Sequence, residues 1–208
     1  MMAENWVGEI TALRRKLAVD GSAALPIEDW PQEVLGFWFE ELTPKEWFKK
    51  SRAVDGRIAD LFLTTYLHVA DGRADDDLAG SLEAARAAII VLDQFPRNLF
   101  RGDPMSFATD RKALVLARRI IEARQDRDLA KDQRLFVYLP FEHSENTADQ
   151  DRSVELISAL GDDELTRYAL AHREVIERFG RFPHRNAVLN RNSTAAEEDY
   201  LAEPGSGF

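Results

Sequence analysis

Two short segments of this chain repeat one combination of residues that can bind an anion. The first is Phe95-Pro96-Arg97-Asn98, and the second is Phe182-Pro183-His184-Arg185-Asn186. Each phenylalanine can anchor its segment in a core, and each proline stops or redirects the helix before it. The arginines offer a planar fork of donors that fits a carboxylate or a phosphate. The repeat therefore favours an anion site built from two chain corners.

A structural interpretation of the same two corners is also open. The Arg and Asn side chains could satisfy the last carbonyl groups of the helix that has just ended. Their positive charge would also complement the negative end of that helix dipole. Both interpretations concern the same four residues: Arg97, Asn98, Arg185 and Asn186.

Asp93 extends the first corner toward the interior. Ile89 and Ile90 precede it at helical spacing, so its carboxylate is expected to leave an apolar helix and enter a core. A buried charge without a partner is very costly, and Arg97, four residues later, can supply one. Asp93 is therefore either half of a structural ion pair or a functional carboxylate with a raised pKa.

A dense polar cluster surrounds His143. In a catalytic interpretation, His143 could act as a general base. The carboxylate that orients it would then come from Glu142, Glu145 or Asp149, so these four residues are the candidate catalytic residues. In a structural interpretation, Glu145 and Asp149 would be acidic groups favoured near the N-terminus of a helix that begins near Thr147.

His172 lies on an apolar helical stripe between Ala169 and Ile176. Such a histidine is either a satisfied core residue or a group that points into one site with His143 and His184. Three histidines and a carboxylate can hold zinc or iron, but the His-Glu-x-x-His spacing of helical zinc sites is absent. We therefore predict no metal and no other cofactor.

The overall composition limits the class of protein. The chain has 208 residues, of which 45% are hydrophobic and 31% charged, and this balance is typical of one soluble globular domain over residues 1–208. Its net charge of −10 disfavours nucleic acids and anionic membranes as partners. The absence of cysteine fits a reducing compartment, and no secretory signal pattern is visible. We predict a cytoplasmic protein and make no prediction of its oligomeric state.

Helical periodicity dominates the chain, and no segment shows the sustained alternation of a strand. Gly180 is expected to end a helix in the left-handed conformation, and Pro140 to separate two helices. Thr147 with Gln150, and Thr194 with Glu197, have the spacing of a capping box. Residues 72–77 are expected to form an exposed acidic loop. The expected helix cores are 4–19, 31–41, 52–70, 80–95, 110–124, 130–139, 147–160, 162–179 and 194–202.

Short connections between these segments predict an all-α fold of eight to ten antiparallel helices, packed as stacked helical hairpins in a bundle or a short solenoid. Three segments also resemble, in the expected order, the bacterial family called domain of unknown function 924. They are residues 92–98, 140–145 and 178–186, and the resemblance covers about residues 31–201. It implies a tetratricopeptide-like helical fold and no established reaction. Residues 203–208 are expected to be a frayed tail.

These observations lead to one main hypothesis and two alternatives. We expect a helical domain that binds a small anionic ligand or an acidic peptide terminus where the two corners and residues 142–149 converge. The first alternative is a hydrolase with His143 as general base, in which Arg97 or Arg185 stabilises developing negative charge. The second is a scaffold without a ligand. The candidate ligand-binding residues are Asp93, Arg97, Asn98, His172, His184, Arg185 and Asn186.

Overall fold

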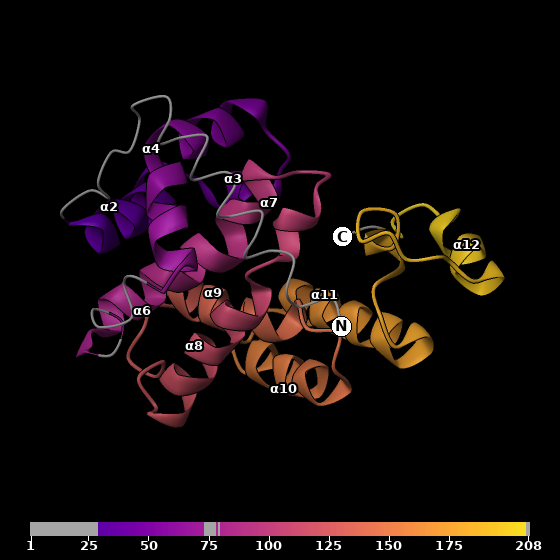
Figure 1. Cartoon of the computed structure of the whole chain (residues 1–208). Coiled ribbons are helices and arrows are strands. Elements are labelled where there is room, and N and C mark those ends of the chain that lie inside the picture. Colours follow the sequence, from indigo (N-terminus) through magenta and orange to yellow (C-terminus); the bar gives the residue numbers. More distant parts are fainter. Residues whose placement is uncertain (1–28, 73–77, 79, 207–208) are drawn as a thin grey trace. The chain divides into compact units, whose positions relative to one another are not determined.

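The computed structural model describes residues 29–72, 78 and 80–206, and within these ranges every regular element is helical (Figure 1). The all-α prediction is confirmed. The expected helix at 4–19 and most of the expected loop at 72–77 lie outside the described residues. No described helix is both long enough and apolar enough to cross a membrane.

The helices group into two compact units, which we describe one at a time. Of the described residues, the first unit contains those up to Arg101 together with Met105–Asp128, and the second contains Gly102–Pro104 together with those from Leu129 onward. The prediction of a single domain over residues 1–208 stays a prediction.

In the first unit, α6 packs against α2 and α8, and α7 packs against α4. Serine side chains cap the N-termini of two of these helices. The hydroxyl of Ser51 accepts a hydrogen bond from the backbone N–H of Val54, and that of Ser81 accepts one from the N–H of Ala84. The elements are α2 (Trp30–Gly36), the π-helix η1 (Phe37–Glu41), α3 (Pro44–Phe48), α4 (Arg52–Ala70), α6 (Leu82–Ile89), the π-helix η2 (Ile90–Gln94), α7 (Phe95–Leu99) and α8 (Asp110–Glu122). A 3-10 turn, η3 (Pro104–Phe107), precedes α8. The short helix α3 was not predicted, because five residues carry too little periodicity to be recognised.

In the second unit, α10 packs against both α9 and α11, and α9 also contacts α11. The elements are α9 (Lys131–Glu142), α10 (Thr147–Ser158), α11 (Asp163–Phe179), the 3-10 turn η4 (Pro183–Arg185) and α12 (Ala195–Leu201). The short connections between α9, α10 and α11 agree with the helical hairpins predicted from the sequence.

Helix α9 does not end at Pro140, and our prediction of a helix junction there was wrong. The helix continues to Glu142, and Pro140 itself is buried. Proline removes the hydrogen bond to the carbonyl group four residues earlier. The flanking residues from Leu135 to Phe141 are buried as well, and their packing keeps the segment helical despite this loss.

Gln150 joins the start of α10 to the end of α9. We expected Thr147 and Gln150 to form a capping box, which was wrong, because Asn146 is the residue that caps α10. The Nε2 of Gln150 instead donates to the carbonyl oxygens of Glu142 and Ser144, at 2.7 Å each. Gln150 thereby satisfies carbonyl groups that the end of α9 leaves without a helical partner.

Gly180 ends α11 as predicted, in the left-handed conformation with φ of +69°, and its N–H donates to Ile176 O at 2.8 Å. No atom would crowd a Cβ at this position, so a substitution strains only the backbone. We expect Gly180→Ala to lower the free energy of unfolding by about 1 kcal/mol, measured by urea denaturation followed by circular dichroism. Gly36→Ala, at a helical φ, is the control, and an equal loss there would contradict this explanation.

Candidate functional site

The first Phe-Pro corner lies where the π-helix η2 passes into α7. Pro96 occupies the first turn of α7, so the helical path is redirected and continues to Leu99. Because Pro96 has no N–H, it cannot donate to a carbonyl group of the preceding turn. The hydroxyl of Thr109 supplies one such hydrogen bond, to Leu92 O at 2.6 Å.

Phe95 is the centre of an aromatic cluster in the first unit. Its ring is fully buried and stacks on Phe62 with a centroid distance of 5.1 Å. The rings of Phe37 and Trp38 lie 6.4 and 5.8 Å away. The neighbours of the Phe95 ring in this cluster are two phenylalanines and a tryptophan. Apolar packing therefore anchors the first corner.

Arg97 binds carboxylates of its own unit. Its two terminal nitrogens donate to the carboxylate of Asp110 at 2.9 and 3.0 Å. Its Nη1 also donates to the carbonyl oxygen of Asp93 and lies 3.7 Å from Oδ1 of the same residue, which is the predicted i,i+4 ion pair. Burial lowers the pKa of Arg97, but Asp110 and Asp93 raise it more, and the net shift is upward. These contacts are those of the structural interpretation.

Asn98 also makes a contact within the first unit. Its Nδ2 donates to Oδ1 of Asp55 at 2.8 Å, and Arg101 donates to the same carboxylate at 2.8 and 3.3 Å. Asp55 lies in the first turn of α4, so these hydrogen bonds connect the end of α7 to the start of α4.

The backbone of the second corner is fixed by an ion pair. The carboxylate of Glu145 accepts the N–H of Phe182 at 2.8 Å and binds the guanidinium of Arg191 at 2.7 and 3.0 Å. Arg191 also donates to the carbonyl oxygen of Phe182 at 3.0 Å. The Glu145–Arg191 pair thus holds both backbone polar groups of Phe182. Burial raises the pKa of Glu145, but the hydrogen bonds from Arg191 and Phe182 lower it more, so the pKa lies below its ordinary value.

Asn186 completes this second corner as a buried structural residue. Its Oδ1 accepts from Nε of Arg191 at 3.0 Å, and its Nδ2 donates to the hydroxyl of Ser193 at 3.1 Å. Asn186 therefore closes the loop between η4 and α12.

The ring of Phe182 has polar neighbours, in contrast to that of Phe95. It is fully buried, and the guanidinium carbon of Arg185 lies 4.5 Å from its centroid. The imidazole rings of His172 and His184 lie 5.7 and 5.5 Å away. We call these four residues the Phe182 cluster. Three of them were predicted ligand-binding residues, and the structure brings them together within the second unit.

His172 has a defined tautomer. Its Nδ1 lies 2.9 Å from the carbonyl oxygen of Tyr168, which can only accept, so Nδ1 carries the hydrogen. The carboxylate of Glu142 lies 3.5 Å from the same nitrogen. This contact joins α9 to α11 beside the Phe182 cluster.

His172 is neutral at physiological pH. Its pKa is lowered to about 3, mainly by burial and to a smaller extent by the nearby groups His143, Arg185 and His184, although the hydrogen bond to Tyr168 acts in the opposite direction. His172 therefore contributes a hydrogen-bonding imidazole to the Phe182 cluster rather than a positive charge.

The catalytic candidates around His143 have mostly structural contacts. His143 is half-buried at the C-cap of α9. Glu145 binds Arg191, and the buried carboxylate of Asp149 accepts the hydroxyl of Ser144 at 2.8 Å at the start of α10. Asp149 lies in the first turn of α10, as the structural alternative predicted, whereas the carboxylate of Glu145 binds Arg191 and the N–H of Phe182. In the part of the chain that the structure describes, no three His, Asp or Glu residues are placed to hold a metal ion.

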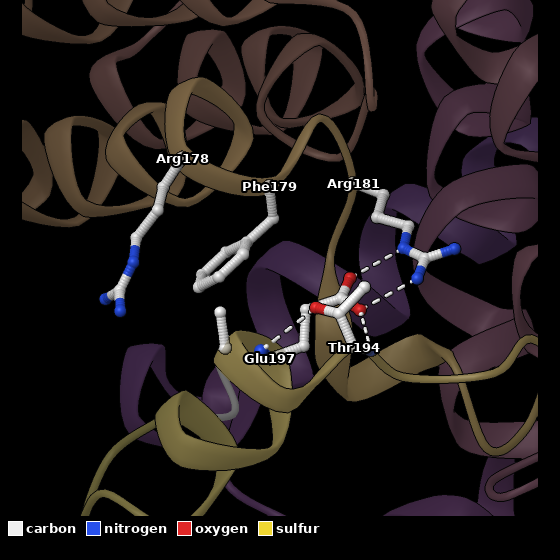
Figure 2. Close-up of a pocket in the computed structure, with 6 residues that line it drawn as sticks. Arg178, Phe179, Arg181, Thr194 and Glu197 are labelled. Carbon is white, nitrogen blue, oxygen red and sulfur yellow. Dashed lines mark hydrogen bonds and ion pairs between the residues drawn. The ribbon is translucent and has the colours of Figure 1, made fainter.

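Sequence reasoning missed an open pocket between the end of α11 and α12 (Figure 2). On one side, Arg181 binds Glu197 at 2.6 and 2.8 Å, and Glu197 forms the predicted capping box with Thr194. On the other side, the exposed Arg178 lies 4.6 Å from the ring centroid of Phe179. The capping spacing was visible in the sequence, but the Arg181–Glu197 pair depends on how the intervening loop closes.

A model of the family described as a bacterial protein of unknown function (DUF924) matches residues 34–205 of this chain. The chain belongs to the DUF924 family. A solved structure of a protein of unknown function from Agrobacterium tumefaciens, ATU0120, shares 38% identity with this DUF924 protein at a TM-score of 0.79. The match covers 84% of this chain and 97% of the Agrobacterium protein. No curated protein matches the chain.

The two predicted corners belong to different units of this DUF924 protein. Asp93, Arg97 and Asn98 make their contacts in the first unit, whereas Asn186 and the Phe182 cluster belong to the second. The convergence of the two corners stays a prediction. The Phe182 cluster lies entirely within the second unit.

Proposed function

We propose that the second unit of this DUF924 protein binds a small anionic ligand or an acidic peptide terminus at the Phe182 cluster. One observation carries the proposal: the chain repeats the Phe-Pro corner, but the ring of Phe182, which shares a small apolar cluster with Val175 and Ile176, also has charged and hydrogen-bonding side chains against it. Aromatic rings surround Phe95, whereas an arginine and two histidines surround Phe182.

The first corner acts as an internal control for the second. Apolar packing anchors the ring of Phe95. The charges of the first corner are paired, because the buried Asp93 pairs with Arg97, and Arg97 also pairs with Asp110. Arg185 is 7% exposed and His172 also 7%, so the second corner brings a guanidinium and an imidazole out of water. Desolvation of such groups is costly. Both groups are therefore already desolvated in the folded protein.

Arg185 is the member of the Phe182 cluster that suits an anion best. Its guanidinium is charged at every physiological pH and offers several donors in one plane, whereas His172 is neutral. Stacking on the ring of Phe182 also holds the guanidinium in a defined orientation, which lowers the entropy lost when a carboxylate or phosphate binds.

The geometry favours binding over hydrolysis. In the hydrolase alternative, a carboxylate orients His143; among the candidates, Glu145 binds Arg191 and Asp149 accepts the hydroxyl of Ser144. Glu142, the third candidate, lies against His172. If hydrolysis occurs, His143→Ala should abolish turnover in a phosphatase and esterase screen without a change in fold. The scaffold alternative predicts that no anion raises the melting temperature.

A thermal-shift titration with inorganic phosphate and with short acidic peptides tests the proposal. We expect the wild type to be stabilised, because a ligand of the native state raises the melting temperature. Arg185→Met should weaken binding about tenfold to 100-fold through the loss of charge-assisted hydrogen bonds.

Arg178→Met is the matched control, because Arg178 also stacks on an aromatic ring but lies exposed at the pocket of Figure 2. It should bind like the wild type. If Arg178→Met loses the stabilisation and Arg185→Met keeps it, the anion binds in that pocket and the proposal is wrong.

A further inference from the structure

A positively charged stretch in the first unit is independent of the site proposed above. Residues 111–127 contain six basic and two acidic residues in a chain whose net charge is −10. This surplus of four positive charges extends from α8 into the turn beyond it. The basic residues are Arg111, Lys112, Arg118, Arg119, Arg124 and Arg127, and the acidic residues are Glu122 and Asp126.

The outer face of α8 carries an ordered row within this stretch. Arg111, Val115 and Arg119 follow one another at intervals of four residues, so they form one ridge along the helix. All three are exposed, and Val115 is 42% exposed. With a rise of 1.5 Å per residue, the two arginines lie about 12 Å apart along the helix axis. We call these three residues the α8 ridge.

The two arginines of the α8 ridge are not neutralised within the described residues. Neither Arg111 nor Arg119 forms an ion pair there, in contrast to Arg97 and Arg101 of the same unit. Asp110, the carboxylate beside Arg111 in sequence, is held by Arg97 instead. The ridge therefore presents two guanidinium groups with an apolar side chain between them.

We propose that the α8 ridge docks an acidic amphipathic segment of another protein. Its carboxylates would pair with Arg111 and Arg119, and an apolar side chain between them would cover Val115. In a helical partner this pattern is Glu-x-x-x-Leu-x-x-x-Glu, which places its carboxylates at the same spacing of about 12 Å. The planar guanidinium of arginine binds carboxylates well. Exposed charges at the edge of an interface mainly set its specificity and its association rate.

The choice of an acidic protein segment over a nucleic acid rests on two observations. The centre of the ridge is apolar, whereas a phosphate backbone needs a row of cations. In addition, the net charge of −10 would repel a long polyanion around this short basic patch. A short acidic segment with an apolar residue meets neither obstacle.

Fluorescence anisotropy with a labelled helical peptide that contains the Glu-x-x-x-Leu-x-x-x-Glu pattern tests this proposal. Binding should weaken as salt is added, because exposed charge pairs are screened. Each exposed ion pair contributes about two- to fivefold in affinity, so the double variant R111E/R119E should lose at least about fourfold. R167E is the control, because Arg167 is an exposed helical arginine of the second unit that pairs with the exposed Glu164.

The outcomes separate this proposal from the function proposed above. Arg185→Met should leave peptide binding at the α8 ridge unchanged. Three results would overturn the proposal: no binding of the peptide at low salt, equal binding by R111E/R119E, or equal binding of a peptide with lysines in place of both glutamates. Tighter binding of a DNA duplex of equal length would also overturn it in favour of a nucleic acid.

Discussion

Phe95→Ala is expected to lower the free energy of unfolding of the first unit by about 3–5 kcal/mol. The substitution removes a fully buried ring that contacts Phe37, Trp38 and Phe62. The cost has two parts, the lost burial of the ring and the cavity that remains between the three aromatic neighbours. Phe95→Leu should cost less, because leucine fills part of that cavity.

Tryptophan fluorescence during urea denaturation reports this loss selectively. All four tryptophans precede residue 101 in the sequence, and three lie in described helices of the first unit: Trp30, Trp38 and Trp47. Phe48→Ala is the control, because Phe48 is 60% exposed and its removal should change the free energy of unfolding by less than about 1 kcal/mol. Equal losses for the two variants would contradict the central position of Phe95.

Glu145→Ala is expected to lower the free energy of unfolding of the second unit by about 2–3 kcal/mol. The change removes the acceptor for Phe182 N–H and leaves the guanidinium of Arg191, 17% exposed, without its carboxylate. Amide hydrogen exchange over residues 182–191 should accelerate, because this carboxylate fixes that segment. Glu155→Ala removes an exposed i,i+3 pair with Arg152 and should change stability by less than about 0.5 kcal/mol.

The contribution of Glu145 should also depend on pH in a defined direction. Its pKa is lower in the folded protein than in the unfolded chain, because Arg191 and Phe182 N–H favour the carboxylate despite its burial. The stabilisation is therefore complete above the unfolded pKa of about 4.3 and is lost as pH falls through the folded value. The stability difference between wild type and Glu145→Gln, measured from pH 7 to pH 3, should shrink below about pH 4. A difference that grows in acid would contradict the ion pair.

The sequence predicted the long helices well, because their periodicity and end signals are local. Gly180 and the Thr194–Glu197 capping box illustrate such signals. The predictions of a helix junction at Pro140 and of a capping box at Thr147 were wrong for a physical reason. A proline is tolerated inside a helical segment whose neighbouring residues are all buried, and the side chain of Gln150 bonds the end of the preceding helix rather than the start of its own. Both outcomes depend on tertiary packing, which a local pattern does not contain.

The candidate site was likewise predicted only in part from the sequence. The sequence identified both corners and the ion pair between Asp93 and Arg97, since those residues are one helical turn apart. It did not distinguish the two corners, because the surroundings of Phe95 and Phe182 come from residues far away in the chain. Arg191, which holds the backbone of Phe182, was not singled out for the same reason.

Nitrogen-15 NMR of the arginine side chains, during a titration with inorganic phosphate, tests the central claim most directly. The Nε resonance of Arg185, assigned by its loss in Arg185→Lys, should shift in a saturable manner as phosphate binds the Phe182 cluster. The Nε resonance of Arg178, an exposed arginine that stacks on the half-buried ring of Phe179, should not follow the same curve. A titration in which Arg185 shows no saturable shift, or in which Arg178 shifts at the same phosphate concentration, would contradict the proposed anion site.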